Sequence, residues 1–323
     1  MPNIILNMLN CNNTNANTGM QDCVFDLREV SGFIAVPQGT AITPAQQIVL
    51  QTTILAGINN NNPALRWYPF QTLWEIEDQS SESTTETSAF GGINYLSDGK
   101  PSFKMLHKHG VTMNKLYRKA FHLQQNRYDI LLMDKKNKVL VGYSDGTGSL
   151  RGFDLEMFAV ETWKIPTGSN GTAMYSISLG LSESSQWNDD IASLKLHDTL
   201  NISQIVGLKQ TFLNNASTSF SAGVATIQVL GATTNLYDIY STNLNTSNIW
   251  SAKNTATGAV IAVTSVVLDP ALKGVIITLD TTPGGNYPAT AGAGITIEFG
   301  NVSALTTANM PGLSESTLLT TRA

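Results

Sequence analysis

The residues of this chain best suited to chemistry are its four histidines, its two cysteines and a few carboxylates. His107 and His109 flank Lys108, so in a strand their side chains would share one face and could give two ligands to a metal ion. No further ligand follows at matching spacing, and ordinary surface histidines are the simpler interpretation. Cys11 and Cys23 lie too far apart for a zinc-knuckle pair. We therefore expect structural or free thiols and no metal site.

Two short polar segments could be mistaken for binding or catalytic loops. The segment 144–148 lacks the alternating acidic ligands of a calcium loop and the lysine of a phosphate loop, so it predicts a hairpin turn. Asp189 and Asp190 are adjacent and would point in opposite directions in a strand, which favours a solvated turn or helix start. No G-x-S-x-G or H-E-x-x-H motif occurs. The sequence thus predicts neither an enzyme nor a cofactor.

The composition indicates a two-domain protein with a surface poor in charge. A chain of 323 residues fits two domains of ordinary size, and 42% hydrophobic residues suffice for real cores. Charged residues make up 13%, which is low against a typical quarter. Such a surface is tolerable where neighbouring molecules cover much of it. The net charge of -5 argues against direct binding to the phosphates of nucleic acids.

The N-terminal segment does not read as a secretion signal. It begins Met-Pro-Asn without a basic region, and Asn7 interrupts its short apolar run. No apolar run in the sequence approaches the length of a membrane span. We expect a protein made in the cytoplasm, with reduced cysteines.

A change of composition near residues 214–219 divides the chain. Nearly all Lys, Arg and His residues precede this Asn/Ser/Thr stretch, which we interpret as a linker between domains 1–213 and 214–323. The second part consists of short β-branched runs separated by Asn, Gly and Pro turns: 226–230, 236–240, 259–268, 275–279 and 295–299. This pattern predicts a β-sandwich without helices.

Two helices are expected in the first part. Thr43, followed by Pro44 and by Gln46 three residues after the cap, forms a capping-box pattern for a helix that ends at Gly57. A second helix is predicted over 112–125. Its cap would be Thr112, and its buried stripe Met113, Leu116, Ala120 and Phe121.

Alternating patterns in the first part of the chain predict an antiparallel sheet with one face on the core and one face in water. In 175–181 apolar residues alternate with Ser176 and Ser178, and in 153–157 they alternate with Asp154 and Glu156. The run 128–133 is uniformly apolar, as in a strand covered on both faces. One helix against such a sheet gives an α+β, mainly β domain, a barrel or sandwich with one flanking helix.

The order of these elements resembles the major tail tube proteins of long-tailed bacteriophages. It comprises an acidic Ser/Thr loop at 75–88, Gly91-Gly92 with Tyr95, a strand with Phe103, the helix 112–125, the strand 128–133, the turn 145–148 and the strands 152–163 and 172–181. Some members of that family append an immunoglobulin-like domain, which the sandwich of the second part resembles. Residues 41–62 exceed the family pattern and receive no role.

The resemblance implies a structural virion protein, not an enzyme. Residues 1–213 would form a tube-building β-barrel that assembles into stacked hexameric rings, and 214–323 would decorate the outside of the tube. Contacts between rings would involve Glu75, Glu77, Asp78, Glu82, Thr84 and Glu86. A lumen that lets DNA slide should not be basic, and its lining would include Asp154, Glu156, Ser176 and Ser178.

The expected partners are further copies of the chain, the tape measure, terminator and baseplate proteins of a tail, and DNA in transit, without a membrane. The protein would be assembled in the host cytoplasm and end in the virion tail. Three other interpretations stay open: a capsid decoration protein, the inner tube of a contractile injection system, and a carbohydrate-binding module built on 216–323.

Overall fold

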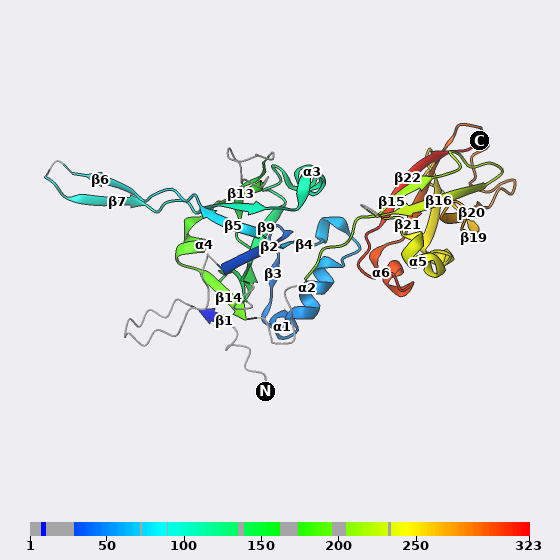
Figure 1. Cartoon of the computed structure of the whole chain (residues 1–323). Coiled ribbons are helices and arrows are strands. Elements are labelled where there is room, and N and C mark those ends of the chain that lie inside the picture. The colour runs from blue at the N-terminus through cyan, green and yellow to red at the C-terminus, as the bar shows by residue number, and fades with distance from the viewer. Residues whose placement is uncertain are drawn as a thin grey trace. The chain divides into compact units, whose positions relative to one another are not determined.

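The computed structural model describes residues 8–10, 29–71, 73–88, 90–134, 139–161, 174–195, 205–231 and 234–323, and Cys11 and Cys23 lie outside this part. The chain forms two compact units, Met1–Gly207 and Leu208–Ala323 (Figure 1). The boundary therefore precedes the expected position between 213 and 214. The reason is that residues 212–215, which include 214 and 215 of the expected linker, form a strand of the second unit that pairs with residues 227–230.

The first unit contains two antiparallel sheets. In the eight-stranded sheet, hereafter the large sheet, β11 pairs with β10 and β3, and the remaining order is β1-β14-β10-β9-β2-β4. Its strands are β1 (Met8–Asn10), β2 (Val30–Pro37), β3 (Ala41–Ile42), β4 (Tyr68–Gln71), β9 (Tyr128–Asp134), β10 (Val139–Ser144), β11 (Leu150–Arg151) and β14 (Ile191–Lys195). The small sheet has the order β12-β13-β8-β5. Its strands are β5 (Leu73–Asp78), β8 (Ser102–His107), β12 (Leu155–Val160) and β13 (Tyr175–Leu181).

The main core of this unit draws side chains from both sheets. Phe33 of the large sheet stacks on Phe70, with ring centroids 4.4 Å apart, and meets Phe158 of the small sheet edge-on at 6.1 Å. Within the described residues these sheets do not close into a barrel, so of the two expected forms the barrel is wrong and a two-sheet arrangement is observed.

A second core lies on the other face of the large sheet. Here Ile34 and Leu131 pack against Ile54 and Ile58 of helix α2 (Leu50–Ile58). The strand β9 is consequently buried along its whole length, as its uniformly apolar sequence predicts. Residues 41–62, which the family pattern left without a role, thus cover this face of the large sheet.

The capping box at Thr43 is confirmed, but the helix it begins is short. The Thr43 N–H donates to Gln46 Oε1 at 2.9 Å, and the Gln46 N–H donates to Thr43 Oγ1 at 3.4 Å. Helix α1 (Pro44–Ile48) then stops because Val49 adopts φ -116°, ψ 41°. Helix α2 follows, and the 3-10 turn η3 (Pro63–Leu65) leads to β4.

Helix α3 (Gly110–Phe121) differs from its prediction in both its start and its buried face. It begins just after His109, where Gly110 adopts φ 86°. Its inward side carries Asn114, Tyr117 and Phe121, whereas Met113 and Ala120, expected in the core, are exposed. The aromatic rings decide this, since Tyr117 and Phe121 both pack on Phe70, at 4.8 and 4.9 Å.

The second unit is a sandwich of two four-stranded antiparallel sheets. One contains β15 (Phe212–Asn215), β16 (Val224–Leu230), β20 (Gly274–Leu279) and β19 (Val263–Asp269) in that order. The other contains β18 (Val260–Ile261), β17 (Trp250–Asn254), β21 (Gly294–Phe299) and β22 (Ser316–Thr321). Both sheets contribute to one core, for example with Ile227, Ile277 and Ile297.

The expectation that this sandwich lacks helices is wrong. Residues 236–240, read as a strand, lie in and next to helix α5 (Tyr237–Leu244), and α6 (Val302–Thr307) follows β21. The helix α5 begins where Asn235 Oδ1 accepts the Tyr237 N–H at 2.9 Å, and Leu236 is buried beside it. Every helix in the described part of the chain is too short or too polar to cross a membrane.

Candidate assembly surface

The acidic Ser/Thr loop expected at 75–88 is part of a long hairpin. The ladder between β5 and β8 continues outward, because the Gln79 N–H donates to Ser102 O at 2.8 Å and the Ser81 N–H donates to Lys100 O at 3.1 Å. Gly99 is required here, since a Cβ at this position would lie 1.7 Å from Ser81 O.

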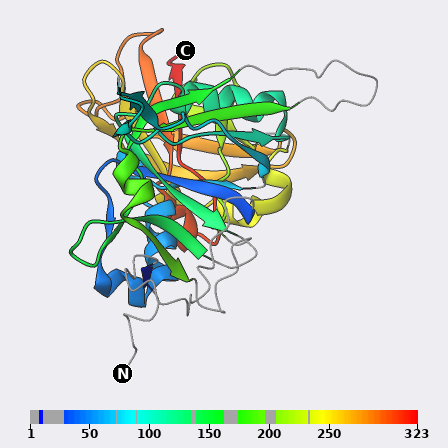
Figure 2. The same ribbon diagram turned by 90° about the vertical axis from the view of Figure 1, so that its left-hand side faces the viewer.

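The outer part of this hairpin projects from the first unit. We name the described residues 79–88 and 90–100 the arm; it includes β6 (Thr84–Thr87) and β7 (Ile93–Ser97). Every residue of these two strands is exposed, and they pair with each other alone (Figure 1). In Figure 2 the arm points toward the viewer. An isolated two-stranded hairpin is marginally stable in water, and the described residues pack nothing against the arm to stabilise it.

Large apolar side chains are displayed on the arm. Phe90 at the tip is 101% exposed, Ile93 75% and Tyr95 58%. Ile93 and Tyr95 pair with Thr87 and Thr85, so these four side chains share one face of the ribbon. The opposite face carries the Glu86 and Asn94 pair. The arm is therefore amphipathic, and nothing among the described residues covers its apolar face.

The expected inter-ring residues divide between the base and the arm. Glu75, Glu77 and Asp78 lie on β5, where Glu77 is half-buried and its carboxylate lies 3.5 Å from Lys104 Nζ. Further out, Glu82, Thr84 and Glu86 are fully solvent-facing. Sequence reasoning chose these polar residues and gave no contact role to Phe90 and Ile93. The alternation of Ile93 and Tyr95 directly after Gly91-Gly92 is the signal that could have found them.

Three of the four expected lumen residues lie on the outer face of the small sheet. The inward residues of β13, such as Ile177 and Leu179, belong to the core, so Ser176 and Ser178 point outward as their alternation predicts. Their expected exposure is wrong, because both are buried. Ser176 Oγ donates to Glu161 Oε2 at 2.6 Å and Ser178 Oγ donates to Glu161 Oε1 at 2.9 Å.

The same outer face carries more acidic than basic groups. Glu156 is exposed and pairs with Lys100 at the base of the arm. Lys104 of β8 pairs with Glu77, whereas Glu75 has no ion-pair partner among the described residues. Lys100 and Lys104 are thus matched by carboxylates, whereas Lys108, just after β8, lies over the Trp74 ring at 3.1 Å.

Asp154 is not grouped with the other expected lumen residues. It precedes β12 and receives a hydrogen bond from Gln186 Nε2 at 2.7 Å, while its N–H donates to Gln186 Oε1 at 3.0 Å. Its carboxylate faces Asp129 at the start of β9, a buried residue whose pKa burial raises to about 7. We therefore assign Asp154 a structural position inside the first unit.

The two edges of the small sheet differ. At β12, the edge carbonyls are occupied by the segment that includes α3: Arg118 Nη1 donates to Val160 O at 2.7 Å, and the Leu123 N–H donates to Phe158 O at 2.8 Å. At the opposite edge, β5 pairs with β8, and no other strand of the described residues pairs with it. One edge is thus covered and the other presents free backbone groups.

The histidine pair lies at the end of β8. His107 ends β8 and is fully buried, whereas His109 follows the strand, with the ring centroids 4.9 Å apart. Burial, and then the neighbouring His109, lowers the pKa of His107 to about 4, so its ring is neutral at physiological pH. No cluster of three or more His, Cys, Asp or Glu side chains suited to a metal ion is found in the described ranges.

The predicted hairpin turn at 144–148 is confirmed. The Asp145 carboxylate accepts the Thr147 N–H at 2.9 Å and Arg151 Nε at 2.8 Å, which closes the turn between β10 and β11. The Thr147 hydroxyl also donates to Asp145 Oδ1, and this hydrogen bond first, then those from Arg151 and the Thr147 N–H, lower the pKa of Asp145 to about 2. Its oxygens are engaged within the turn and are not arranged around a bound ion.

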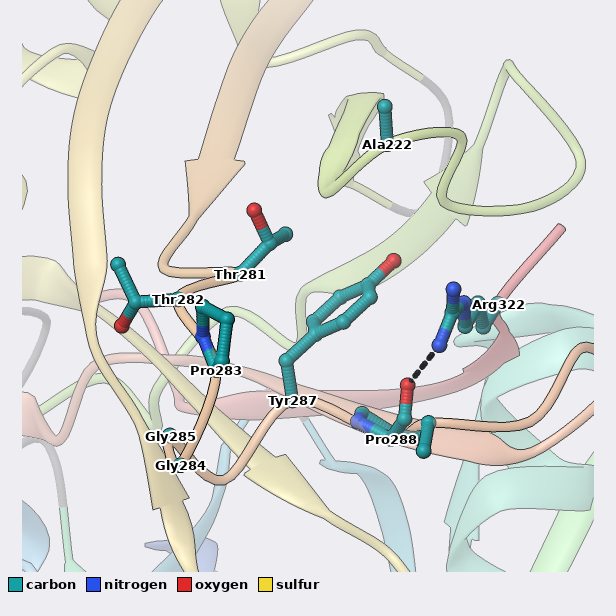
Figure 3. Close-up of a pocket in the computed structure, with 10 residues that line it drawn as sticks. Ala222, Thr281, Thr282, Pro283, Gly284, Gly285, Tyr287, Pro288 and Arg322 are labelled. Carbon is teal, nitrogen blue, oxygen red and sulfur yellow. Dashed lines mark hydrogen bonds between the residues drawn. The ribbon is translucent and has the colours of Figure 1, made fainter.

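The second unit has one notable surface hollow, of about 410 Å³ (Figure 3). The Arg322 guanidinium lies 5.3 Å from the Tyr287 ring centroid and donates to Pro288 O. Thr281, Thr282 and the Gly284-Gly285 segment complete the rim. The hollow offers hydroxyls and an arginine, and the described residues that line it include no carboxylate, histidine or cysteine.

No protein-family model matches this chain, and no curated protein is detectably similar to it.

Proposed function

We propose that this chain is a structural protein of a virion tail that assembles into stacked rings and forms the tube through which DNA passes. The observation that carries the proposal is the arm, on which Phe90 is fully exposed and Ile93 and Tyr95 are more than half exposed. Such a segment is stabilised when a neighbouring molecule buries it. The neighbour in a homo-oligomer is a second copy of the chain.

The small sheet supports the same function. The free edge of β5 can pair with a strand of a neighbour, which would extend the sheet around a ring. The outer face, with Glu75 and Glu156, is not basic, so a polyanion would pass over it without capture. In this arrangement the outer face lines the lumen, and Glu156 is its exposed acidic residue.

The second unit is proposed to be an immunoglobulin-like decoration on the outside of the tube. The cores of the two units share no residue, so each unit has hydrophobic cores of its own. The proposed partners are further copies of the chain, the tape measure, terminator and baseplate proteins of the tail, and DNA in transit. The inner tube of a contractile injection system has the same stacking requirement and is the second candidate.

The test compares the full chain with a variant whose arm is shortened. Residues 82–99 are replaced by an Asn-Gly turn, because Ser81 and Lys100 already pair through their backbones at 3.1 Å. By negative-stain electron microscopy and sedimentation, the full chain should form hollow stacked rings, and the shortened chain only subunits or single rings. Absence of hollow assemblies from the full chain, or tubes of unchanged length from the shortened chain, would refute the proposal.

A point variant refines the test. Ile93→Ser with Tyr95→Ser removes the apolar face of the arm, whereas Asn94→Ser changes the opposite face and serves as the matched control. Burial of one large apolar side chain contributes about 1.5–3 kcal/mol, so the double variant should weaken each contact by about 3–6 kcal/mol. The control should form tubes like the unmodified chain.

A further inference from the structure

We infer that the arm of one copy docks on the exposed face of helix α3 of the next copy. This inference rests on the proposed function, because it assigns the surface that receives the arm. It goes beyond that function by naming the partner residues, and it can fail while the stacking role of the arm stands.

Helix α3 has an outward face that nothing in the described part of the first unit covers. Val111, Lys115 and Lys119 are spaced by four residues, so they form one ridge, and all three are exposed. Neither lysine forms an ion pair or hydrogen bond with the described residues. Val111 is 61% exposed, and Leu123, just after the helix, is also 61% exposed. The face is therefore both basic and apolar.

The arm has the complementary properties. Glu82 and Glu86 are exposed and have no ion-pair partner among the described residues. Helix α3 contains Lys115, Arg118 and Lys119 and no acidic residue. Opposite charges on two surfaces steer association and fix its register. Glu86 lies on the face of the ribbon opposite Ile93 and Tyr95, so it is the acidic face of the arm that meets the basic face of the helix.

The arm cannot reach α3 of its own chain. The arm joins the start of β8 at Ser102, and α3 begins at Gly110, just after the end of β8 at His107. A strand of this length spans about 20 Å, and the arm extends away from it. Figure 1 shows the arm and α3 at opposite ends of the small sheet. A contact between them in different copies is head-to-tail, and such a contact repeats along a stack.

The experiment is a charge exchange followed by tube formation. Glu82→Lys with Glu86→Lys reverses the arm, and Lys115→Glu with Lys119→Glu reverses the helix. Each double variant should raise the critical concentration for assembly at least about tenfold, because like charges then face each other. The quadruple variant, which restores opposite charges, should assemble nearly as well as the unmodified chain. Circular dichroism confirms that each variant is folded.

A matched control has the same change of net charge elsewhere on the first unit. Glu183 and Asp190 are exposed at the two ends of α4 (Ser184–Asn188), and Glu183→Lys with Asp190→Lys should leave assembly unchanged. Normal tubes from the Lys115→Glu, Lys119→Glu variant, or no recovery in the quadruple variant, would overturn the docking on α3. Those results would leave the proposed function standing. The proposed function itself would be refuted if the chain with the shortened arm still formed tubes.

Discussion

A buried carboxyl in the first unit provides a quantitative test of the structure. Asp129, at the start of β9, is 1% exposed. Its Oδ2 accepts the Gly39 N–H at 2.7 Å, whereas no donor among the described residues reaches Oδ1. The Asp154 carboxyl faces it, with Arg151, Tyr143 and Asp145 farther around the group. Burial first, and then Asp154, raises the pKa of Asp129 to about 7.

The pKa of Asp129 sets the sign of a pH dependence of stability. Below pH 4 the carboxyl is protonated in the folded and the unfolded chain, so it makes no pH-dependent contribution. Between pH 4 and 7 the unfolded chain loses the proton and the folded chain keeps it, so stability falls as pH rises. A rise from 3.8 to about 7, at 1.36 kcal/mol per pH unit, corresponds to on the order of 4 kcal/mol above pH 7.

The substitution Asp129→Asn isolates this effect. An asparagine accepts the Gly39 N–H and donates to Asp154, so it keeps the contacts without the charge. The variant and the unmodified chain should be about equally stable at pH 4.5. At pH 8 the variant should unfold at higher temperature by about 10 °C, since 1 kcal/mol shifts the midpoint by about 2–4 °C for a unit of this size.

Calorimetry of the two proteins at both pH values measures this difference, with Asp190→Asn, an exposed site, as the matched control. The control should follow the unmodified chain at every pH. If the difference between Asp129→Asn and the unmodified chain is the same at pH 4.5 and pH 8, Asp129 has an ordinary pKa, and the arrangement described around it is wrong.

Two further measurements test the packing of the first unit. In an NMR titration the ring of His107 should remain neutral down to pH 5, because burial lowers its pKa to about 4; a midpoint above 6 would contradict its burial. Gly152→Ala should destabilise the unit by about 1–3 kcal/mol in chemical unfolding, since the new Cβ would lie 2.9 Å from Asp129 Cβ. Gly180→Ala, where the nearest atom is 3.4 Å away, is its control and should unfold nearly like the unmodified chain.

Local sequence patterns predicted much of the secondary structure because the causes are local. The capping box at Thr43, the turn at 144–148 and the strand at 175–181 each depend on neighbours within a few residues, and each is observed. Helix α5 was not predicted, although a local contact also lies at its start. Just before it, Asn235 Oδ1 accepts the Tyr237 N–H, a contact that a short apolar run such as 236–240 does not reveal.

The burial of polar side chains could not be predicted from local sequence patterns, because it depends on partners that are far away in the sequence. Alternation placed Ser176 and Ser178 on the outer face correctly, but only the structure shows Glu161 accepting from both hydroxyls. Asp154 has the same pattern as Glu156, yet Gln186 and Asp129 hold it elsewhere. The sequence thus predicted which faces exist and not which of their residues meet water.

The asymmetry of the first unit bears on how copies would associate. If copies of the chain associated in no preferred orientation, the two edges of the small sheet would offer similar surfaces. Here α3 and the segment after it occupy the β12 edge, no described strand pairs with the outer edge of β5, and the arm projects from the start of β8. The outer edge of β5 and the arm lie in different directions from the same strand pair, β5 and β8. Sideways pairing through β5 and stacking through the arm can therefore occur in one molecule at once, which a tube of stacked rings requires.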